Sequence, residues 1–229
     1  MSTASQEMEK RVNTQWTELC SALKVDVGLS QKWWKIVREH YCESWRYYHT
    51  LGHVHHMLDK LTAYEDKLKN PKEVALAVYF HDVIYDPRAG DNEEQSAVTF
   101  EKFAEECLCS GSEHGVDRQR VCEMIMLTKK HQTPAHMAEN EYGDSDEHYL
   151  LDFDMAILGE ESSEYRLYSA NIRREYAHIP NKEYCRGRAH VLKEFLATRK
   201  IYCTEVFHEK YEENARKNIL NEIASLSNN

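Results

Sequence analysis

Glycine and proline are scarce in this chain, with 8 and 4 among 229 residues, so the residues that break helices are few. Residues that favour helices, chiefly Glu, Lys, Leu and Ala, are frequent. The length is sufficient for one large domain with a sizeable core. The composition therefore predicts an all-α protein, and one compact helical domain is the simplest organisation.

Long hydrophobic runs are also lacking. No stretch is apolar over the roughly 20 residues that a membrane-spanning helix needs, and Met1–Lys10 has no signal-peptide core. The seven cysteines are an odd number and include no Cys-x-x-Cys pair, which predicts reduced thiols inside a cell. We therefore expect a cytoplasmic protein that is not inserted in a membrane.

An excess of positive charge is absent as well. The formal net charge is −10 at pH 7, which disfavours nonspecific binding to a nucleic acid polymer or an anionic membrane. The densest basic spots are Arg173-Arg174 and Arg186-Gly187-Arg188. Because arginine binds phosphate in a bidentate manner, they suit a phosphorylated small molecule. Pairing with nearby glutamates on a helix surface is the alternative.

Apolar periodicity and capping residues predict a series of helices. Ser30 is the expected N-cap of one helix, Pro71 the first residue of another, and Asp91 or Asn92 the cap of a third. His131–Glu147 is polar and is expected to form a long loop. The expected helices cover Thr14–Leu23, Ser30–Tyr41, Thr50–Leu68, Pro71–Asp82, Asn92–Cys107, Asp117–Lys130, Tyr149–Leu158, Ser163–His178, Glu183–Arg199 and Val206–Leu226.

The pair His81-Asp82 follows the continuously apolar run Val74–Phe80. Such a run predicts a buried segment, and a carboxylate at its end is costly to bury unless something neutralises it. A metal ion would do so, because imidazole nitrogen and carboxylate oxygen are both good ligands. The sequence therefore predicts a metal site centred on this pair.

Four histidines belong to the third expected helix: His49, His53, His55 and His56. At about 100° per residue, three of them share one stripe, opposite the core-facing stripe of Leu51, Val54, Leu58 and Leu61. The i, i+4 spacing of His49 and His53 allows two imidazoles to approach one site. A solvent-facing surface that is rich in histidine is the alternative.

Carboxylates follow at two places. Three of them come soon after the His-Asp pair: Asp86, Glu93 and Glu94. Their loop and helix-start positions also suit caps and solvent contacts. Farther along, Asp152 and Asp154 interrupt the apolar stretch Leu150–Leu158. Two residues apart on a helix, they point in different directions, so at most one is expected to face a given site.

These residues, in this order, resemble the HD superfamily of metal-dependent phosphohydrolases. The resemblance implies the metal ligands His53, His81, Asp82 and Asp154. His49 is the alternative to His53, and Asp152 is the alternative to Asp154. Five longer motifs are similar to an uncharacterised family of predicted HD phosphohydrolases: Tyr48–His53, His81–Asp86, Asn92–Ala97, Leu151–Gly159 and Ile172–Tyr176.

The similarity extends over about Trp16–Leu226 and implies one HD-type helical bundle over residues 1–229. Its metal-site core would cover about 45–160, and helices within 161–226 would pack on it. The implied cofactor is one divalent ion, which can be Mn, Fe, Co, Ni, Zn or Mg. The implied activity is hydrolysis of a small phosphorylated metabolite, such as a nucleotide.

Roles for the remaining candidates follow from that activity. Asp86, Glu93 or Glu94 would orient the attacking water or act as a base. The candidates for phosphate contacts are His49, His131 and Arg173. In alarmone hydrolases of the superfamily an acidic pair follows the His-Asp motif. Here Tyr85 takes the first of those two positions, which argues against alarmone hydrolysis.

Two other functions use the same scaffold. An iron oxygenase needs extra histidine ligands between the His-Asp pair and the last aspartate, and the chain offers His114, His131, His136 and His148. Only His131 lies where a site residue is expected. The second is a catalytically silent protein that binds metal or nucleotide and acts as a regulator. The expected partner is a small phosphorylated molecule, and a homodimer is left open.

Overall fold

The computed structural model describes residues 3–108, 115–139 and 141–227. Within these ranges the secondary structure is helical and contains no strand, so the predicted all-α fold is confirmed. None of the described helices is long and apolar enough to cross a membrane. The chain divides into unit 1, Met1–Lys130, and unit 2, His131–Asn229. This boundary falls inside the expected metal-site core of about 45–160, and the single domain stays a prediction.

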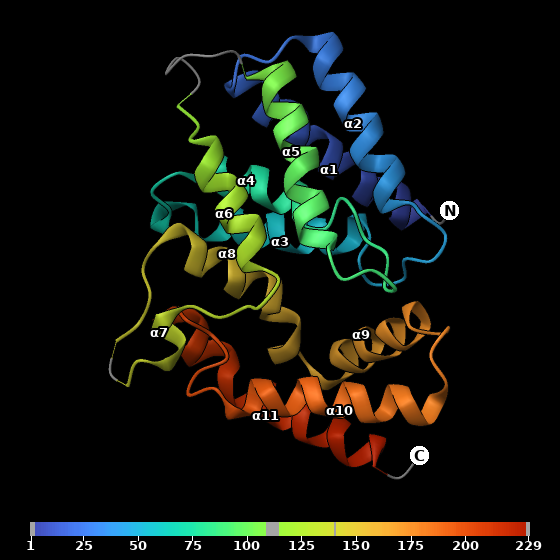
Figure 1. Ribbon diagram of the computed structural model, residues 1–229. Coiled ribbons are helices and arrows are strands. Elements are labelled where there is room, and N and C mark those ends of the chain that lie inside the picture. Colours follow the sequence, from blue (N-terminus) through green and yellow to red (C-terminus); the bar gives the residue numbers. More distant parts are fainter. Residues whose placement is uncertain (1–2, 109–114, 140, 228–229) are drawn as a thin grey trace. The chain divides into compact units, whose positions relative to one another are not determined.

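Unit 1 is built around one apolar helix. Its helices are α1 (Thr3–Ala22), α2 (Val27–Tyr41), α3 (Leu51–Ala63), η1 (Glu65–Lys67), α4 (Pro71–Phe80), α5 (Asn92–Cys107) and α6 (Arg118–Leu127). Pro71 opens α4 as predicted. Helix α4 packs against α3, α5 and α6 (Figure 1). Every residue in Val74–Phe80 is at most 8% exposed, as expected for a helix that is apolar on all sides.

An aromatic cluster joins α1, α2, α4 and α5 of unit 1. The ring of Trp16 lies 5.0 Å from that of Tyr79 and 5.5 Å from that of Phe103, between centroids. Trp33 also lies 5.5 Å from Phe103. Such pairs contribute about 0.5–1.5 kcal/mol each beyond their burial. The buried hydroxyl of Tyr79 donates to the carbonyl of Val12 at 2.8 Å, so this polar group is satisfied inside the core.

The start of α2 differs from the prediction. Asp26 is the N-cap, and its Oδ1 accepts the backbone N–H groups of Gly28 at 2.8 Å and Leu29 at 3.1 Å. Ser30 lies inside the helix and is 7% exposed, and its carbonyl accepts the indole N–H of Trp16 at 3.0 Å. The prediction was wrong because a carboxylate caps as well as a serine does and occurs one turn earlier.

The start of α3 also differs. Thr50 is the N-cap, with its Oγ1 accepting the N–H of Gly52 at 3.2 Å, so His49 precedes the helix. The predicted helical spacing of His49 and His53 was therefore wrong. The helix ends at Ala63, and η1 follows it. Only three of the four histidines stand on α3.

Unit 2 contains α7 (Pro134–Met137), α8 (Asp146–Met155), η3 (Ala156–Gly159), α9 (Ser162–Glu175), α10 (Asn181–Ala197) and α11 (Glu205–Leu226). Its core includes the rings of Phe153 and Phe207, 5.5 Å apart. Segment η3 packs closely on α11, because a Cβ at Gly159 would lie 2.5 Å from Tyr211 Cβ and 2.7 Å from its carbonyl oxygen. A side chain does not fit there.

The predicted loop His131–Glu147 holds α7 and the first residues of α8. Both helices begin with a capping box in which histidine is the third helical residue. The Nδ1 of His136 accepts the N–H of Thr133 at 3.0 Å, and that of His148 accepts the N–H of Ser145 at 3.3 Å. Glutamate or glutamine usually fills this position. Because histidine takes their place here, the sequence pattern did not reveal where either helix begins.

Two buried carboxylates hold the segment that leads into α11. The backbone N–H groups of residues 201–204 all donate to them, the first two to Glu212 and the last two to Asp152, at 2.8–3.1 Å. Thr204 Oγ1 also donates to Asp152, at 2.6 Å. Backbone groups that lie outside any helix are thereby satisfied without water.

Candidate metal centre

The end of α4 places His81 in the core of unit 1. The helix stops at Phe80, and His81 continues it as the C-cap, with helical backbone angles and its N–H bonded to the carbonyl of Ala77 at 2.8 Å. The residue is 1% exposed. The next residue, Asp82, has a side chain that is 15% exposed. The pair therefore lies where the buried helix gives way to a loop that solvent reaches.

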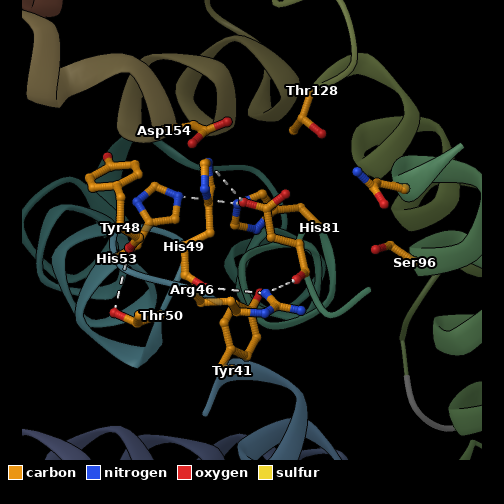
Figure 2. A network of polar contacts seen from close by, with 12 residues as sticks. Tyr41, Arg46, Tyr48, His49, Thr50, His53, His81, Ser96, Thr128 and Asp154 are labelled. Atoms are coloured by element: carbon orange, nitrogen blue, oxygen red, sulfur yellow. Dashed lines mark hydrogen bonds and ion pairs between the residues drawn. The ribbon is translucent and has the colours of Figure 1, made fainter. Parts of the chain in front are cut away.

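His53 meets this pair from α3. It is 4% exposed, and its Nε2 lies 3.2 Å from Nε2 of His81 (Figure 2). The same atom of His81, Nε2, also lies 3.1 Å from Oδ2 of Asp82. The ligand atoms of the three residues all lie within 4.8 Å of one another. The structure thus brings together three of the four predicted ligands.

The tautomer of His81 is set by the backbone. Its Nδ1 lies 3.0 Å from the carbonyl oxygen of Val78. A carbonyl oxygen only accepts, so Nδ1 donates in this contact, and Nε2 is the ring nitrogen left to bind a metal ion. Metal-binding histidines ordinarily have their second ring nitrogen bonded in this way. Two imidazole nitrogens and one carboxylate oxygen form a donor set that fits a divalent cation.

A buried arginine fixes the backbone beneath the cluster (Figure 2). Nη1 of Arg46 donates to the carbonyl of Asp82 at 2.6 Å and to that of His49 at 3.2 Å, and Nη2 donates to the carbonyl of Val83 at 2.9 Å. Its Nε lies 3.0 Å from Oε2 of Glu43, and its side chain is fully buried. Arg46 therefore joins the turn before α3 to the loop after α4.

His49 lies beside the cluster and outside the group of three. Its Nε2 is 3.9 Å from Oδ2 of Asp82, and its ring centroid lies 6.0 Å from that of His53. The ring packs at 4.3 Å against Tyr85, and the side chain is 20% exposed. The geometry favours His53 as the ligand and places His49 as a neighbour that can donate a hydrogen bond.

The acidic candidates differ in what they contact. Asp86 forms a local turn, in which its Oδ1 accepts the N–H of Arg88 at 2.9 Å. Glu94 is paired with Lys129, whose hydrogen bond lowers the pKa of Glu94. Glu93 lies 3.9 Å from the same amine. Lys129 also donates to the carbonyl of Gly90 at 2.9 Å, so it ties α6 to this acidic segment.

The loop that carries the His-Asp pair is bonded to the start of α5. The backbone N–H of Ile84 donates to Ser96 Oγ at 3.1 Å, and Ser96 donates back to its carbonyl at 3.2 Å. The side chain of Asn92 exchanges two hydrogen bonds with the backbone of Asp86, both at 3.0 Å. The first turn of α5, with its two glutamates, is therefore held at the loop after Asp82.

The two aspartates of α8 have different surroundings, as their spacing predicted. Asp152 is 1% exposed and accepts hydrogen bonds from Cys203 and Thr204. Burial raises its pKa to about 7, although these hydrogen bonds act in the opposite direction. Asp154 has a side chain that is 12% exposed, and its Oδ2 lies 2.7 Å from Nε2 of His131. Asp152 is thus committed to holding the segment before α11.

Arg173 stabilises the C-terminus of α9. Its guanidinium donates to the carbonyls of Tyr176 at 2.7 Å and Ile179 at 3.1 Å, and it lies 4.5 Å from the ring centre of Tyr184. Arginine near the last turn of a helix ordinarily does this. The contacts account for Arg173 without a phosphate.

The extra histidines of the oxygenase alternative are partly explained. His136 and His148 each use Nδ1 in a capping box, and His131 is paired with Asp154. His114 lies outside the described residues. Among the described residues, the side chains close enough to hold a metal ion together are those of His53, His81 and Asp82, and His131, His136 and His148 do not belong to that group.

Sequence reasoning missed Arg46 and Lys129. Each acts on a segment far away in the chain, and neither follows a spacing rule. Comparisons with protein-family models, with curated proteins and with solved structures gave no match. The resemblance to HD phosphohydrolases therefore rests on the sequence motifs.

Proposed function

We propose that this protein is a metal-dependent phosphohydrolase that acts on a small phosphorylated metabolite, such as a nucleotide. The observation that carries the proposal is the convergence of His53, His81 and Asp82, with Nδ1 of His81 bonded to a backbone carbonyl. The order of motifs in the sequence supports it independently.

The grouped residues His53, His81 and Asp82 would hold the metal, and the resemblance of the sequence motifs adds Asp154 as a fourth ligand. A bound divalent cation lowers the pKa of a coordinated water and neutralises charge on a phosphate group. Nitrogen and oxygen donors of this kind are compatible with Mn, Fe, Co, Ni, Zn and Mg. The protein contributes the fixed ring orientations and the buried position of the two histidines.

Glu93 is the best candidate for the general base among the three acidic residues. Lys129 stabilises the ionised form of Glu94 and so weakens it as a base. Asp86 uses one oxygen in its turn. Glu93 is held on the first turn of α5, close in the chain to the anchored Asn92, and its nearest amine is 3.9 Å away.

The phosphate contacts are assigned to His49 and His131 in this proposal. His49 lies beside Asp82 and is partly exposed, so its ring can meet a phosphate oxygen. His131 is held at Asp154, the proposed fourth ligand. Arg173 is not assigned to phosphate, because its guanidinium already donates to two backbone carbonyls at the end of α9.

The test begins with the metal content of protein purified without added metal. The wild type should carry about one divalent ion per chain, while His81→Ala and Asp82→Ala should lose it and keep their helical circular dichroism. His55→Ala is the matched control, because His55 stands on α3, the helix of the proposed ligand His53, but is paired with Asp59 at 3.6 Å. Retention of the full metal content by both site variants would contradict the ligand assignment.

The second step is a phosphate-release screen with the metal found, over nucleotides and sugar phosphates. Release that depends on Asp82 supports the proposal. A bound metal without release from any substrate would favour a silent binding protein. Two irons per chain with oxygen consumption would favour the oxygenase.

A further inference from the structure

Unit 2 contains a cavity that no residue of the proposed metal site lines. It has a volume of about 500 Å³ and is lined by residues of α9, of the first turns of α10, and of α11. Sites for small molecules typically measure about 300–1,000 Å³. The space is therefore large enough for a metabolite.

Polar side chains of two helices line this cavity. One stripe of α9 contributes Ser162, Arg166, Ser169 and Arg173, and one stripe of α11 contributes Asn218, Asn221, Glu222 and Ser225. Some of these side chains serve the fold, since Asn218 donates to the carbonyls of Leu158 and Glu160, both at 2.9 Å. Arg166 and Asn221 are exposed to solvent, so a ligand can reach them.

The one carboxylate that lines the cavity is already neutralised. Burial alone would raise the pKa of Glu222, but the charge and hydrogen bonds of Arg188, with the hydroxyls of Tyr165 and Ser169, keep it below its ordinary value. Nε of Arg188 lies 3.0 Å from Oε1 of Glu222. Arg188 also donates to the hydroxyl of Tyr168 at 3.1 Å. This pair adds no net charge to the cavity.

Hydrogen-bond donors at the cavity remain available. Among the described residues, the side chains of Arg166, Asn181 and Asn221 have no hydrogen bond or ion pair with another residue, and all three line the cavity. Guanidinium donates only, and each amide offers two further donors. Arg173 adds a second positive charge at the same wall. The cavity therefore combines positive charge with free donors, in a chain whose formal net charge is −10.

We propose that this cavity is a binding site for a small organic anion, with several acceptor oxygens from phosphate or carboxylate groups. Arg166 makes the charged contact, and the amides of Asn181 and Asn221 donate to further oxygens. The site is separate from the proposed metal centre. It gives unit 2 a ligand of its own, whether or not the chain is a hydrolase.

The test is calorimetric titration of the full-length, metal-free protein with inorganic phosphate, AMP and citrate. At least one probe should bind with a stoichiometry of one. Arg166→Ala should weaken that binding by about tenfold or more, the usual effect of losing a charge-assisted hydrogen bond. Asn221→Asp should also weaken it, because it adds a negative charge. Both positions are exposed, so circular dichroism should confirm unchanged folding.

Two controls make the result specific. Arg174→Ala removes an exposed arginine of α9 that does not line the cavity, and it should leave the affinity within about twofold. His81→Ala should bind the probe as the wild type does. The proposal is overturned if no probe binds at millimolar concentration, if Arg174→Ala weakens binding as much as Arg166→Ala, or if His81→Ala abolishes it.

Discussion

Nη1 of Arg46 donates to the carbonyl oxygen of Asp82 at 2.6 Å, across 36 positions of the chain. A charged donor on this carbonyl fixes the peptide that carries the proposed carboxylate ligand. The same guanidinium lies 5.1 Å from the ring centre of Tyr41 and 5.4 Å from that of Tyr85. The loop after α4 is therefore held by a buried cation between two aromatic rings, a contact of favourable energy.

The first prediction concerns Arg46. Arg46→Met should lower the free energy of unfolding by about 3 kcal/mol, because three carbonyls and the carboxylate of Glu43 lose a charged donor. Arg46→Lys keeps the charge but loses the fork of donors, and it should weaken metal binding by about tenfold with a smaller loss of stability. Urea unfolding and metal titration measure the two effects.

Arg38→Lys is the matched control for Arg46. Arg38 is also paired with a glutamate, Glu9, but its side chain is 35% exposed. We expect a change within about 0.5 kcal/mol and unaltered metal affinity. Equal metal affinity in Arg46→Lys and the wild type would show that the clamp does not position the site.

The second prediction separates the two aspartates of α8. Asp152→Asn should lower the free energy of unfolding by about 2 kcal/mol. One of its two accepting oxygens becomes an amide NH₂ group, which cannot accept the hydrogen bonds that Cys203 and Thr204 donate. Asp154→Asn should leave stability nearly unchanged and lower metal content. Thermal unfolding and metal analysis of both variants show which of the two aspartates binds the metal. If Asp152→Asn loses the metal and Asp154→Asn keeps it, the assignment is reversed.

The third prediction concerns pH. Burial, with the nearby charges of His148, His131 and Lys200, lowers the pKa of His136 from 6.5 to about 4. Between those values the unfolded chain binds a proton that the folded chain does not. Stability should therefore be highest above pH 6.5 and fall by up to about 3 kcal/mol as the pH drops to 4.

Urea unfolding at a series of pH values measures the contribution of His136. His136→Gln keeps the capping acceptor of the box but does not titrate, so this part of the pH dependence should disappear. His190→Gln removes a histidine whose side chain is 75% exposed and should leave the wild-type profile intact. Identical profiles for wild type and His136→Gln would refute the contribution of His136.

The fourth prediction compares two glycines. Gly159→Ala should destabilise unit 2 by about 1–3 kcal/mol, because its Cβ would lie 2.5 Å from Tyr211 Cβ and η3 must shift away from α11. Gly187→Ala, within α10, meets nothing within 4 Å. It should stabilise the helix by about 0.5–1 kcal/mol. Calorimetric unfolding of both variants should show changes of opposite sign.

The parts of the site that sequence predicted share one property. His53, His81 and Asp82 are recognisable because their chemistry is unusual beside the apolar run that ends in α4. Burial of that run and the grouping of these side chains follow from local pattern and ligand chemistry. The all-α fold follows likewise from a composition with few helix breakers.

What the sequence did not predict depends on distant contacts. Asp152 and Asp154 look equivalent in the sequence, and the first differs because Cys203 lies 51 positions away and donates to it. Arg46 is likewise defined by carbonyls it reaches through the fold. The caps of α2, α7 and α8 were missed for a local reason, since several side chains can accept the same N–H groups. The periodicity of apolar residues reports neither such long-range contacts nor which of several side chains caps a helix.

The distribution of tryptophan has a spectroscopic consequence. All four tryptophans of the chain precede Pro71 and lie in unit 1, and the indole of Trp45 donates to the carbonyl of Tyr85 at 3.0 Å, just after the His-Asp pair. Intrinsic tryptophan fluorescence therefore reports on unit 1 alone, whereas far-ultraviolet circular dichroism averages both units. Coincident unfolding curves from the two signals would mean that the units melt as one cooperative body. A fluorescence transition that shifts on metal addition would place the ion's stabilising effect in unit 1.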